Sequence, residues 1–325
     1  MKPTCSIVIR AYNEDKHIGR LLSGIFQQTV KDVQVILVDS GSTDATIEIA
    51  STYPVEVIHI QPEEFTFGHS LNWGIEHTYA EKVVIASAHV YPVYPDWLEK
   101  LLQPLESTQT ALSYGKQRGM ETTKFSENMV FQQWFPDHTV NRQDHPFCNN
   151  ANAAIRRDIW ENHPYDEHLP ALEDLAWANW AQKQGYQIAY TGEAEVIHVH
   201  NETWQGVFNR YRREGMAFKR IYPQEHFSFI DFIRLFSANT RIDFQEMQRQ
   251  RKGMATLNEI IQFRWAQFWG TYQGYRSSSG PLTWKLKQTF YYPKSSLQEV
   301  HTITRDVDPI PYPETVVSKN PGSSE

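Results

Sequence analysis

Apolar residues follow two different periods in the first hundred residues. Continuous apolar runs predict strands buried on both faces, as in a parallel sheet, at residues 5–9, 33–38, 55–60 and 83–86. Helical spacing separates these runs, and one predicted helix face consists of Ile18, Leu21, Leu22, Ile25 and Phe26. Further helices are predicted from Ala45 toward Thr52, at 70–79 and at 97–102. Alternating strands and helices predict an α/β fold with right-handed crossovers.

Polar turns follow the first two predicted strands. Asn13 and Asp44 are each placed to cap the helix that comes next. Open α/β sheets bind nucleotides at the carboxyl ends of their strands, so Glu14, Asp39 and Ser42 are predicted to lie at a nucleotide site. The simpler alternative is that Asp39 only forms the turn, as Asp often does.

The pattern is less regular in the second part of the chain. Residues 112–150 mix polar, aromatic and turn residues, which predicts short strands and a helix near 125–134. Strands are then predicted at 152–155, 188–190 and 195–199, and helices at 158–162 and 173–183.

From Trp204 the chain changes to Arg and aromatic residues at helical spacing, and it ends in a Pro/Ser-rich stretch from Asp308. We expect a nucleotide-binding and catalytic domain at residues 1–205, a helical extension at 206–305 and a flexible tail at 306–325.

Composition narrows the class of protein. The 325 residues are 40% hydrophobic, which suits a globular chain with a large core. A net charge of −7 and a pI near 6.0 argue against a nucleic-acid partner. The two cysteines, Cys5 and Cys148, predict no disulfide framework. The start of the chain has no signal-peptide pattern, and no run approaches the roughly 20 apolar residues of a membrane span. We therefore expect a cytoplasmic protein.

An ordered set of motifs resembles the family 2 glycosyltransferases of the GT-A fold. The motifs are residues 7–14 (IVIRAYNE), residues 38–44 (VDSGSTD) and Glu173-Asp174, within residues 4–205. The resemblance implies a Rossmann-like, mostly parallel sheet flanked by helices and a nucleoside-diphosphate sugar as donor. It places around the nucleotide Ala11, Tyr12, Glu14, Asp39 and Ser42.

The acidic pair Glu173-Asp174 is the predicted catalytic centre. Transfer with inversion needs a base that takes the proton of the acceptor hydroxyl. The resemblance assigns this role to the acid of the motif, so we predict Asp174 as the base and Glu173 as a residue that orients the acceptor or the loop. The alternative is that the two acids only complement the dipole at a helix N-terminus. The preceding amides of Asn149, Asn150 and Asn152 are expected to line the acceptor side.

The chain departs from the family pattern after the fourth strand. The family usually has an Asp-x-Asp motif there that holds a divalent cation, whereas this chain has Ser87, Ala88 and His89. His198 and His200 alternate along a later strand and so point to the same side. Together the three histidines are candidate metal ligands, and imidazole ligands favour Mn²⁺ over Mg²⁺. The alternative is that these histidines pack or cap turns.

If no cation balances the leaving diphosphate, another positive group must do so. Guanidinium groups suit bidentate phosphate contacts, so the candidates are Arg210, Arg212 and Arg213. The alternative is that these arginines form a solvated helix face.

A basic aromatic stretch occupies residues 263–294 and includes Lys285, Lys287 and Lys294. The stretch is compatible with three interpretations, which the sequence leaves open: peripheral contact with the inner face of a membrane, docking on the transferase domain, or a dimer interface.

These observations predict an inverting glycosyltransferase that moves a sugar to a hydroxyl of a glycan or lipid-linked acceptor, in the synthesis of a cell-surface or extracellular polysaccharide. One alternative is a GT-A domain that has lost catalysis and binds a glycan or a partner. The other is a sugar-nucleotidyltransferase, although Ala11, Tyr12, Asn13 and Glu14 do not form the Gly-rich phosphate loop of that class.

Overall fold

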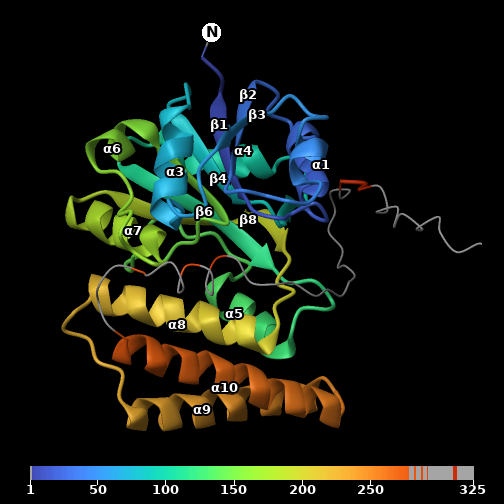
Figure 1. Ribbon diagram of the computed structural model, residues 1–325, viewed down its shortest axis with the longest axis vertical. Helices are drawn as coiled ribbons and strands as arrows, with labels where there is room; N and C mark the ends of the chain where they lie inside the picture. The colour runs from blue at the N-terminus through green and yellow to red at the C-terminus, as the bar shows by residue number, and fades with distance from the viewer. Residues whose placement is uncertain (1, 278–281, 283–286, 288–290, 292–309, 313–325) are drawn as a thin grey trace, which may run out of the picture.

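The computed structural model describes residues 2–277, 282, 287, 291 and 310–312. A central sheet of eight strands, in the order β3-β2-β1-β4-β7-β6-β8-β5, lies between two sets of helices (Figure 1). The strands are β1 (Cys5–Ala11), β2 (Val33–Asp39), β3 (Glu56–His59), β4 (Lys82–Ser87), β5 (Val90–Pro92), β6 (Thr110–Arg118), β7 (Asn152–Arg156) and β8 (Gln187–His198).

The sheet is parallel in its N-terminal half and mixed beyond it. Strands β3, β2, β1 and β4 run parallel, with Ala11 opposite Asp39 and Arg10 opposite Ser87. Strand β7 is antiparallel to both β4 and β6, β8 is parallel to β6, and β5 is antiparallel to β8. The predicted α/β class and its parallel half are confirmed, and the antiparallel strands come from the chain after residue 88.

Helices cover both faces of the sheet. In Figure 1, α3, α6 and α7 lie on one side and α1 and α4 on the other. The helices are α1 (Ile18–Phe26), α2 (Thr46–Ala50), α3 (Phe67–Glu76), α4 (Trp97–Leu102), α5 (Phe125–Trp134), α6 (Arg157–Asn162), α7 (Glu173–Lys183), α8 (Trp204–Ile221), α9 (Phe229–Arg249) and α10 (Met254–Arg276), with a short 3₁₀ helix at Gln103–Glu106.

The two faces of β1 belong to two different apolar clusters. Ile7 and Ile9 pack with α1 and α4, whereas Val8 packs with α3 and α7. Successive strand side chains point to opposite faces, so a strand covered on both sides reads as a continuous apolar run. This is why the first strands were visible in the sequence.

The long helices α8, α9 and α10 form a layer below the carboxyl ends of the parallel strands, with α10 between α8 and α9 (Figure 1). A buried ion pair joins two of them, because Nε of Arg264 lies 2.7 Å from Oδ2 of Asp243. Ser126 of α5 donates a hydrogen bond to the same carboxylate. The division into three domains stays a prediction, and most of residues 306–325 lie outside the described part of the chain. Within the described part, no helix combines the length and the apolarity that crossing a bilayer requires.

Three local predictions need correction. Asn13 does not cap α1, which begins at Ile18; it has a positive φ of 54° and accepts a hydrogen bond from the backbone N–H of Thr43. The predicted strands at 188–190 and 195–199 form one strand, β8. Strand β6 is longer than the short strands expected in its region, and almost all of it is buried.

Candidate active site

The loops after β1 and β2 are joined by hydrogen bonds at the carboxyl ends of the strands. The backbone N–H of Asn13 donates to Oγ of Ser42 at 2.9 Å, and that of Glu14 donates to Oγ1 of Thr46 at 2.7 Å. The predicted cap Asp44 instead precedes the N-cap residue of α2, Ala45, and accepts from the N–H of Thr46, as in an Asx turn. The predicted nucleotide residues therefore lie together, although Ser42 uses its hydroxyl within the loops.

Asp39 is buried at the end of β2, directly opposite Ala11. Its carboxylate accepts hydrogen bonds from the backbone N–H groups of Gly41, at 3.0 Å, and Ser42, at 3.2 Å, and lies 3.3 Å from Nδ1 of His59. Asp39 therefore does stabilise the turn after β2, as the simpler alternative expects. A carboxylate has about four acceptor positions, so Asp39 keeps capacity for a ribose hydroxyl or base N–H.

The three predicted histidines meet at one point of the structure. The rings of His89 and His198 are stacked at 5.1 Å between centroids, and Nε2 of His198 lies 2.9 Å from Nε2 of His200. Their ligand atoms all lie within 4.8 Å of one another, which is the geometry of a cluster that can hold a metal ion. The cluster combines the end of β4 with the end of β8.

Each of these histidines uses Nδ1 for a contact with another side chain. His89 contacts Glu14 at 2.7 Å, His198 contacts Gln117 at 2.7 Å and His200 contacts Glu127 at 2.6 Å. Such partners fix the ring orientation and the tautomer, and they leave Nε2 for a metal. Burial, followed by the charges of the neighbouring histidines, holds the pKa of His198 well below its usual range, so this imidazole stays neutral as a metal ligand must.

Glu127 on α5 adds a carboxylate to the histidine cluster. It forms a second candidate metal group with His200 and Glu202. Burial raises its pKa, but Arg210 and His200 lower it more strongly, and the net value is about 2. Its Oε2 atom is buried and has no hydrogen-bond partner among the described residues. The donor set therefore fits a cation that accepts both nitrogen and oxygen ligands.

The three predicted diphosphate-binding arginines lie on α8. Nη2 of Arg210 lies 2.5 Å from Glu127 and 2.7 Å from Glu202, so it ties α8 to α5. The guanidinium of Arg213 lies 4.9 Å from the ring centroid of Phe67. A diphosphate role for these two residues and for Arg212 stays a prediction, and Arg210 would have to share its charge with two carboxylates.

Glu173 and Asp174 are both buried at the first turn of α7. Asp174 accepts hydrogen bonds from the backbone N–H of Asn150 at 3.1 Å and of Leu175 at 2.7 Å. Glu173 lies 3.4 Å from Nη1 of Arg10. Burial, and then the charge of Glu173, raise the pKa of Asp174 to about 7. A carboxylate with such a pKa can accept a proton near neutral pH.

Arg10, near the end of β1, lies between the two parts of the site. Burial lowers the pKa of His89, but Glu14 raises it more strongly, so that the net pKa is raised. The charge of Arg10 opposes this rise and also opposes the rise in the pKa of Asp174, so Arg10 lies within electrostatic range of the histidine cluster and the acidic pair. Its guanidinium also lies 4.6 Å from the ring centroid of Phe67. The sequence motif contains Arg10, but nothing in its neighbours reveals the contact with Glu173.

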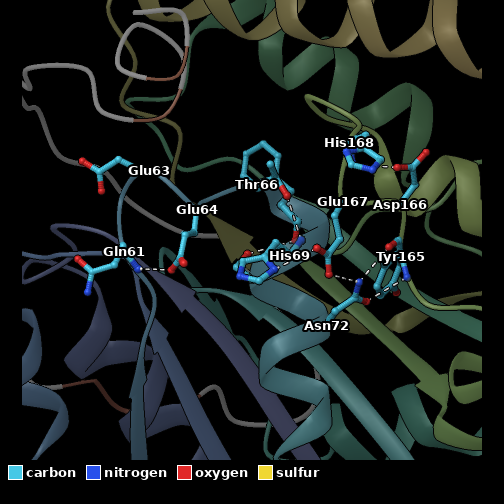
Figure 2. Close-up of polar contacts among 12 residues, drawn as sticks. Gln61, Glu63, Glu64, Thr66, His69, Asn72, Tyr165, Asp166, Glu167 and His168 are labelled. Atoms are coloured by element: carbon cyan, nitrogen blue, oxygen red, sulfur yellow. Dashed lines mark hydrogen bonds and ion pairs between the residues drawn. The ribbon is translucent and has the colours of Figure 1, made fainter. Parts of the chain in front are cut away.

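A polar clamp fixes the loop that leads into α7. Figure 2 shows Asn72 of α3 directed at Tyr165 and Glu167, with His69 beside Glu167. Asn72 is nearly buried, donates to the Tyr165 carbonyl and Glu167, and accepts from the Tyr165 N–H and from Nε1 of Trp160. A Cβ on Gly68 would lie 2.5 Å from the Asp166 carbonyl, so α3 approaches this loop closely.

The same loop ends at a strained residue. Leu172 has a φ of 58°, in the left-handed region that side chains other than Gly rarely adopt. Such strain persists only where the surroundings hold it, and it is common at functional sites. The clamp and Leu172 thus set the position of the acidic pair that follows.

The aromatic and amide side chains on the acceptor side of the acidic pair have different roles. Asn150 contacts both acids, and its side chain lies 3.3 Å from Glu173. Asn152 is instead a core residue, bonded to Trp97 and to the carbonyl groups of Lys116 and Ala194. Trp134 is partly exposed and stacks on Phe147 at 4.4 Å between centroids, which leaves it available to a sugar.

Comparison with known proteins identifies the family. The sequence profile of glycosyl transferase family 2 matches residues 6–163. The O-antigen chain rhamnosyltransferase WbaN of Salmonella anatum is 30% identical over 234 residues, which cover 66% of this chain and 72% of the relative. The chain belongs to glycosyltransferase family 2. A family 2 member is a transferase, which favours the predicted enzyme over a sugar-nucleotidyltransferase or a binding module.

Solved structures show the GT-A fold of this family 2 glycosyltransferase. The mannosyltransferase PcManGT of Pyrobaculum calidifontis, in complex with GDP-Man and Mn²⁺, matches with a TM-score of 0.56 and 18% identity over 85% of each chain. Residues 1–349 of S. aureus TarS, in complex with UDP-GlcNAc, match with a TM-score of 0.52 and 15% identity, over 90% of this chain and 93% of that one. The fold therefore agrees with the family assignment.

Proposed function

We propose that this glycosyltransferase transfers a sugar with inversion from a nucleoside-diphosphate sugar to a hydroxyl acceptor, with Asp174 as the base. The observation that carries the proposal is the buried Asp174, whose pKa is raised to about 7 beside the strand-end loops. Its carboxylate takes the proton of the acceptor hydroxyl while the oxygen attacks the anomeric carbon. Arg10 and Asn150 hold Glu173, which orients the acceptor or its loop.

The donor is held by the loops after β1 and β2. Tyr12 and Glu14 lie on the first loop and Asp39 ends the second strand, so these residues surround the nucleoside. The relative WbaN acts as a rhamnosyltransferase of the O-antigen chain. This favours a deoxyhexose such as rhamnose as the sugar that is transferred.

The histidine cluster with Glu127 suits a divalent cation. His89, His198 and His200 would hold it through Nε2, with Mn²⁺ preferred to Mg²⁺ because nitrogen ligands dominate. The cation would supply positive charge to the leaving diphosphate. Glu14, Gln117 and Glu127 orient the three rings, and Arg210 keeps Glu127 charged.

The acceptor is a growing polysaccharide chain or a lipid-linked glycan, and the reaction takes place on the cytoplasmic side of a membrane. The support is the O-antigen relative and the basic, aromatic composition of the helical layer. The product is a part of a cell-surface or extracellular polysaccharide.

A nucleotide screen followed by a transfer assay tests the proposal. Thermal unfolding is measured with UDP, GDP, dTDP and their sugar forms, each with and without Mn²⁺, and the donor that stabilises the protein is used with candidate acceptors. The expected product has the opposite anomeric configuration from the donor, which NMR determines. Retention of configuration would contradict the proposed single displacement, and stabilisation by no nucleotide would contradict the donor site.

A further inference from the structure

Exposed apolar side chains are concentrated in the helical layer. Of the ten large hydrophobic side chains that are exposed in the described part of the chain, seven lie on α9 and α10, and Ile230 and Met254 are 76% and 74% exposed. The seven are Phe229, Ile230, Ile233, Ile242, Met254, Ile261 and Trp265. Scattered exposed residues are ordinary, whereas a concentration on two neighbouring helices indicates an interaction surface.

The exposed charges of the same region are all of one sign. Between Ser228 and Ser277, every residue of which the structure describes, the acidic residues are buried or half-buried, and two of them, Asp231 and Glu246, pair with Arg234 and Arg249. The exposed charged residues there are Arg234, Arg241, Arg249, Arg251, Lys252 and Arg276. The whole chain has a net charge of −7, so this basic region contrasts with the rest of the protein.

The apolar and basic residues share the outer face of α9. Ile230, Ile233, Arg234 and Arg241 recur at the spacing of one helix face, and Phe232 and Asp243 are buried on the opposite face. Figure 1 shows α9 as the outermost helix, on the side of α10 away from the sheet. The turn to α10 continues the surface with Arg251, Lys252 and Met254, and no described element covers it.

We infer that α9 and the start of α10 lie on the surface of a membrane rich in anionic lipid, with the isoleucines in the headgroup and upper acyl region. Arg side chains extend to lipid phosphates while their stems stay in apolar surroundings. Trp265 of α10 packs edge-on against Phe232 and Phe236 of α9, at 5.3 and 5.8 Å between centroids, so α10 supports the helix that contacts the lipid.

Charge favours a lipid surface over a second copy of this chain. In a symmetric dimer the patch of one copy packs against the same patch of the other. The arginines of the two copies would then face one another without exposed acids to pair with them. An anionic bilayer supplies the opposite charge over the whole patch. This inference rests on the proposed function, which places the acceptor at a membrane, and it names the surface that contacts the lipid. Lipid binding can be measured without donor or acceptor, so the two proposals can fail separately.

Vesicle co-sedimentation of the full chain tests the inference. The parent is expected to sediment with vesicles of phosphatidylcholine and phosphatidylglycerol at low salt, to be released as the salt is raised, and to leave pure phosphatidylcholine vesicles largely unbound. The double variant Arg241→Gln/Lys252→Gln should bind about 10- to 30-fold more weakly. The variant Ile230→Ser/Ile233→Ser should lose about tenfold or more, since its apolar contact is removed.

The matched control is Lys31→Gln/Tyr79→Ser. It removes an exposed cation and an exposed aromatic residue near the amino ends of β2 and β4, at the other end of the molecule from α9, and should bind as the parent does. Thermal unfolding shows that each variant is folded. No sedimentation of the parent at low salt, or equal binding by all variants, would overturn the inference. So would a dimer that the isoleucine variant dissociates, or binding to a DNA oligonucleotide that depends only on the arginines.

Discussion

The backbone N–H of Asn150 donates a hydrogen bond of 3.1 Å to Oδ2 of Asp174. The side-chain amide of the same residue lies 3.3 Å from Glu173, so the segment before β7 holds both acids at the start of α7. Acids that only complement a helix dipole are usually exposed to solvent, whereas these two are buried together. The arrangement therefore favours a catalytic role for the acidic pair. Because burial raises the pKa of Asp174, it also determines the pH range in which Asp174 can act as a base.

The rate of transfer should rise with pH up to neutrality. Asp174 must be ionised to accept a proton, and burial and Glu173 raise its pKa to about 7. Below that pH, kcat/KM should fall by about tenfold for each pH unit. The measurement is kcat/KM between pH 5 and 9 with a verified donor and acceptor. A rate that stays constant from pH 5 to pH 7 would assign the base to another group.

The stability of Asp174→Asn relative to the parent should increase with pH, although the amide accepts only one of the two backbone hydrogen bonds that the carboxylate accepts. A group whose pKa is raised in the folded state contributes stability below its unfolded pKa of 3.8 and loses it as the pH rises through about 7. The loss in the parent is at most about 4 kcal/mol in the free energy of unfolding, and the Asn variant does not undergo it. Urea unfolding at pH 5, 6, 7 and 8 measures the difference, which should grow with pH. Parallel curves for parent and variant would contradict the raised pKa.

Asp39→Asn should weaken nucleotide binding without opening the loops. The amide oxygen still accepts the hydrogen bonds of Gly41 and Ser42, but the charge that binds a ribose hydroxyl or base N–H is lost. The expected cost is about 0.5 to 3 kcal/mol in the free energy of binding, measured by calorimetry. Asp158→Asn is the matched control, because Asp158 lies on α6 and pairs with Arg156 at the surface, and it should leave affinity unchanged. Equal affinities for parent and Asp39→Asn would remove Asp39 from the site.

The dependence of transfer on a divalent cation should reflect the nitrogen ligands of the histidine cluster. Activity should be higher with Mn²⁺ than with Mg²⁺, and His200→Ala should weaken Mn²⁺ binding by about 10- to 100-fold. Calorimetry with the metal alone measures this apart from catalysis. His77→Gln, at the end of α3, is the control histidine variant and should bind Mn²⁺ normally. Full activity in excess EDTA would contradict the metal hypothesis. The charge of the leaving diphosphate would then have to be balanced by Arg210, Arg212 and Arg213.

The sequence predicted the elements that depend on local pattern. The parallel strands and the helices at 97–102, 125–134 and 173–183 agree closely with the structure, because continuous apolar runs and helical spacing are local signals. Strand β6 was obscured because its buried residues include Ser113, Lys116 and Gln117, whose polar groups find partners elsewhere in the fold. Strand β8 was predicted as two strands because Thr191, Gly192 and Glu193 interrupt its apolar pattern.

The site was predictable only in part, for a physical reason. His89, His198 and His200 were chosen from strand ends and alternation, and the fold brings them together. Glu127 and Arg10 were not chosen, because their contacts join residues 73 and 163 positions apart and depend on how α5 and α7 pack on the sheet. A motif within one segment does not show which distant residue its side chains contact. The basic aromatic stretch shows the same limit: Phe263 and Arg264 are buried, Trp265 is exposed, and Lys285 and Lys294 lie outside the described residues.

Asp174→Asn, compared with Glu173→Gln, is the most direct test of the account. The amide has nearly the shape of the carboxylate but cannot accept the acceptor proton, so Asp174→Asn should bind the nucleotide donor like the parent while kcat falls by about 100- to 10,000-fold. Glu173→Gln should be milder if its role is orientation. Near-parental transfer by Asp174→Asn, with donor affinity and folding unchanged, would contradict the assignment of Asp174 as the base.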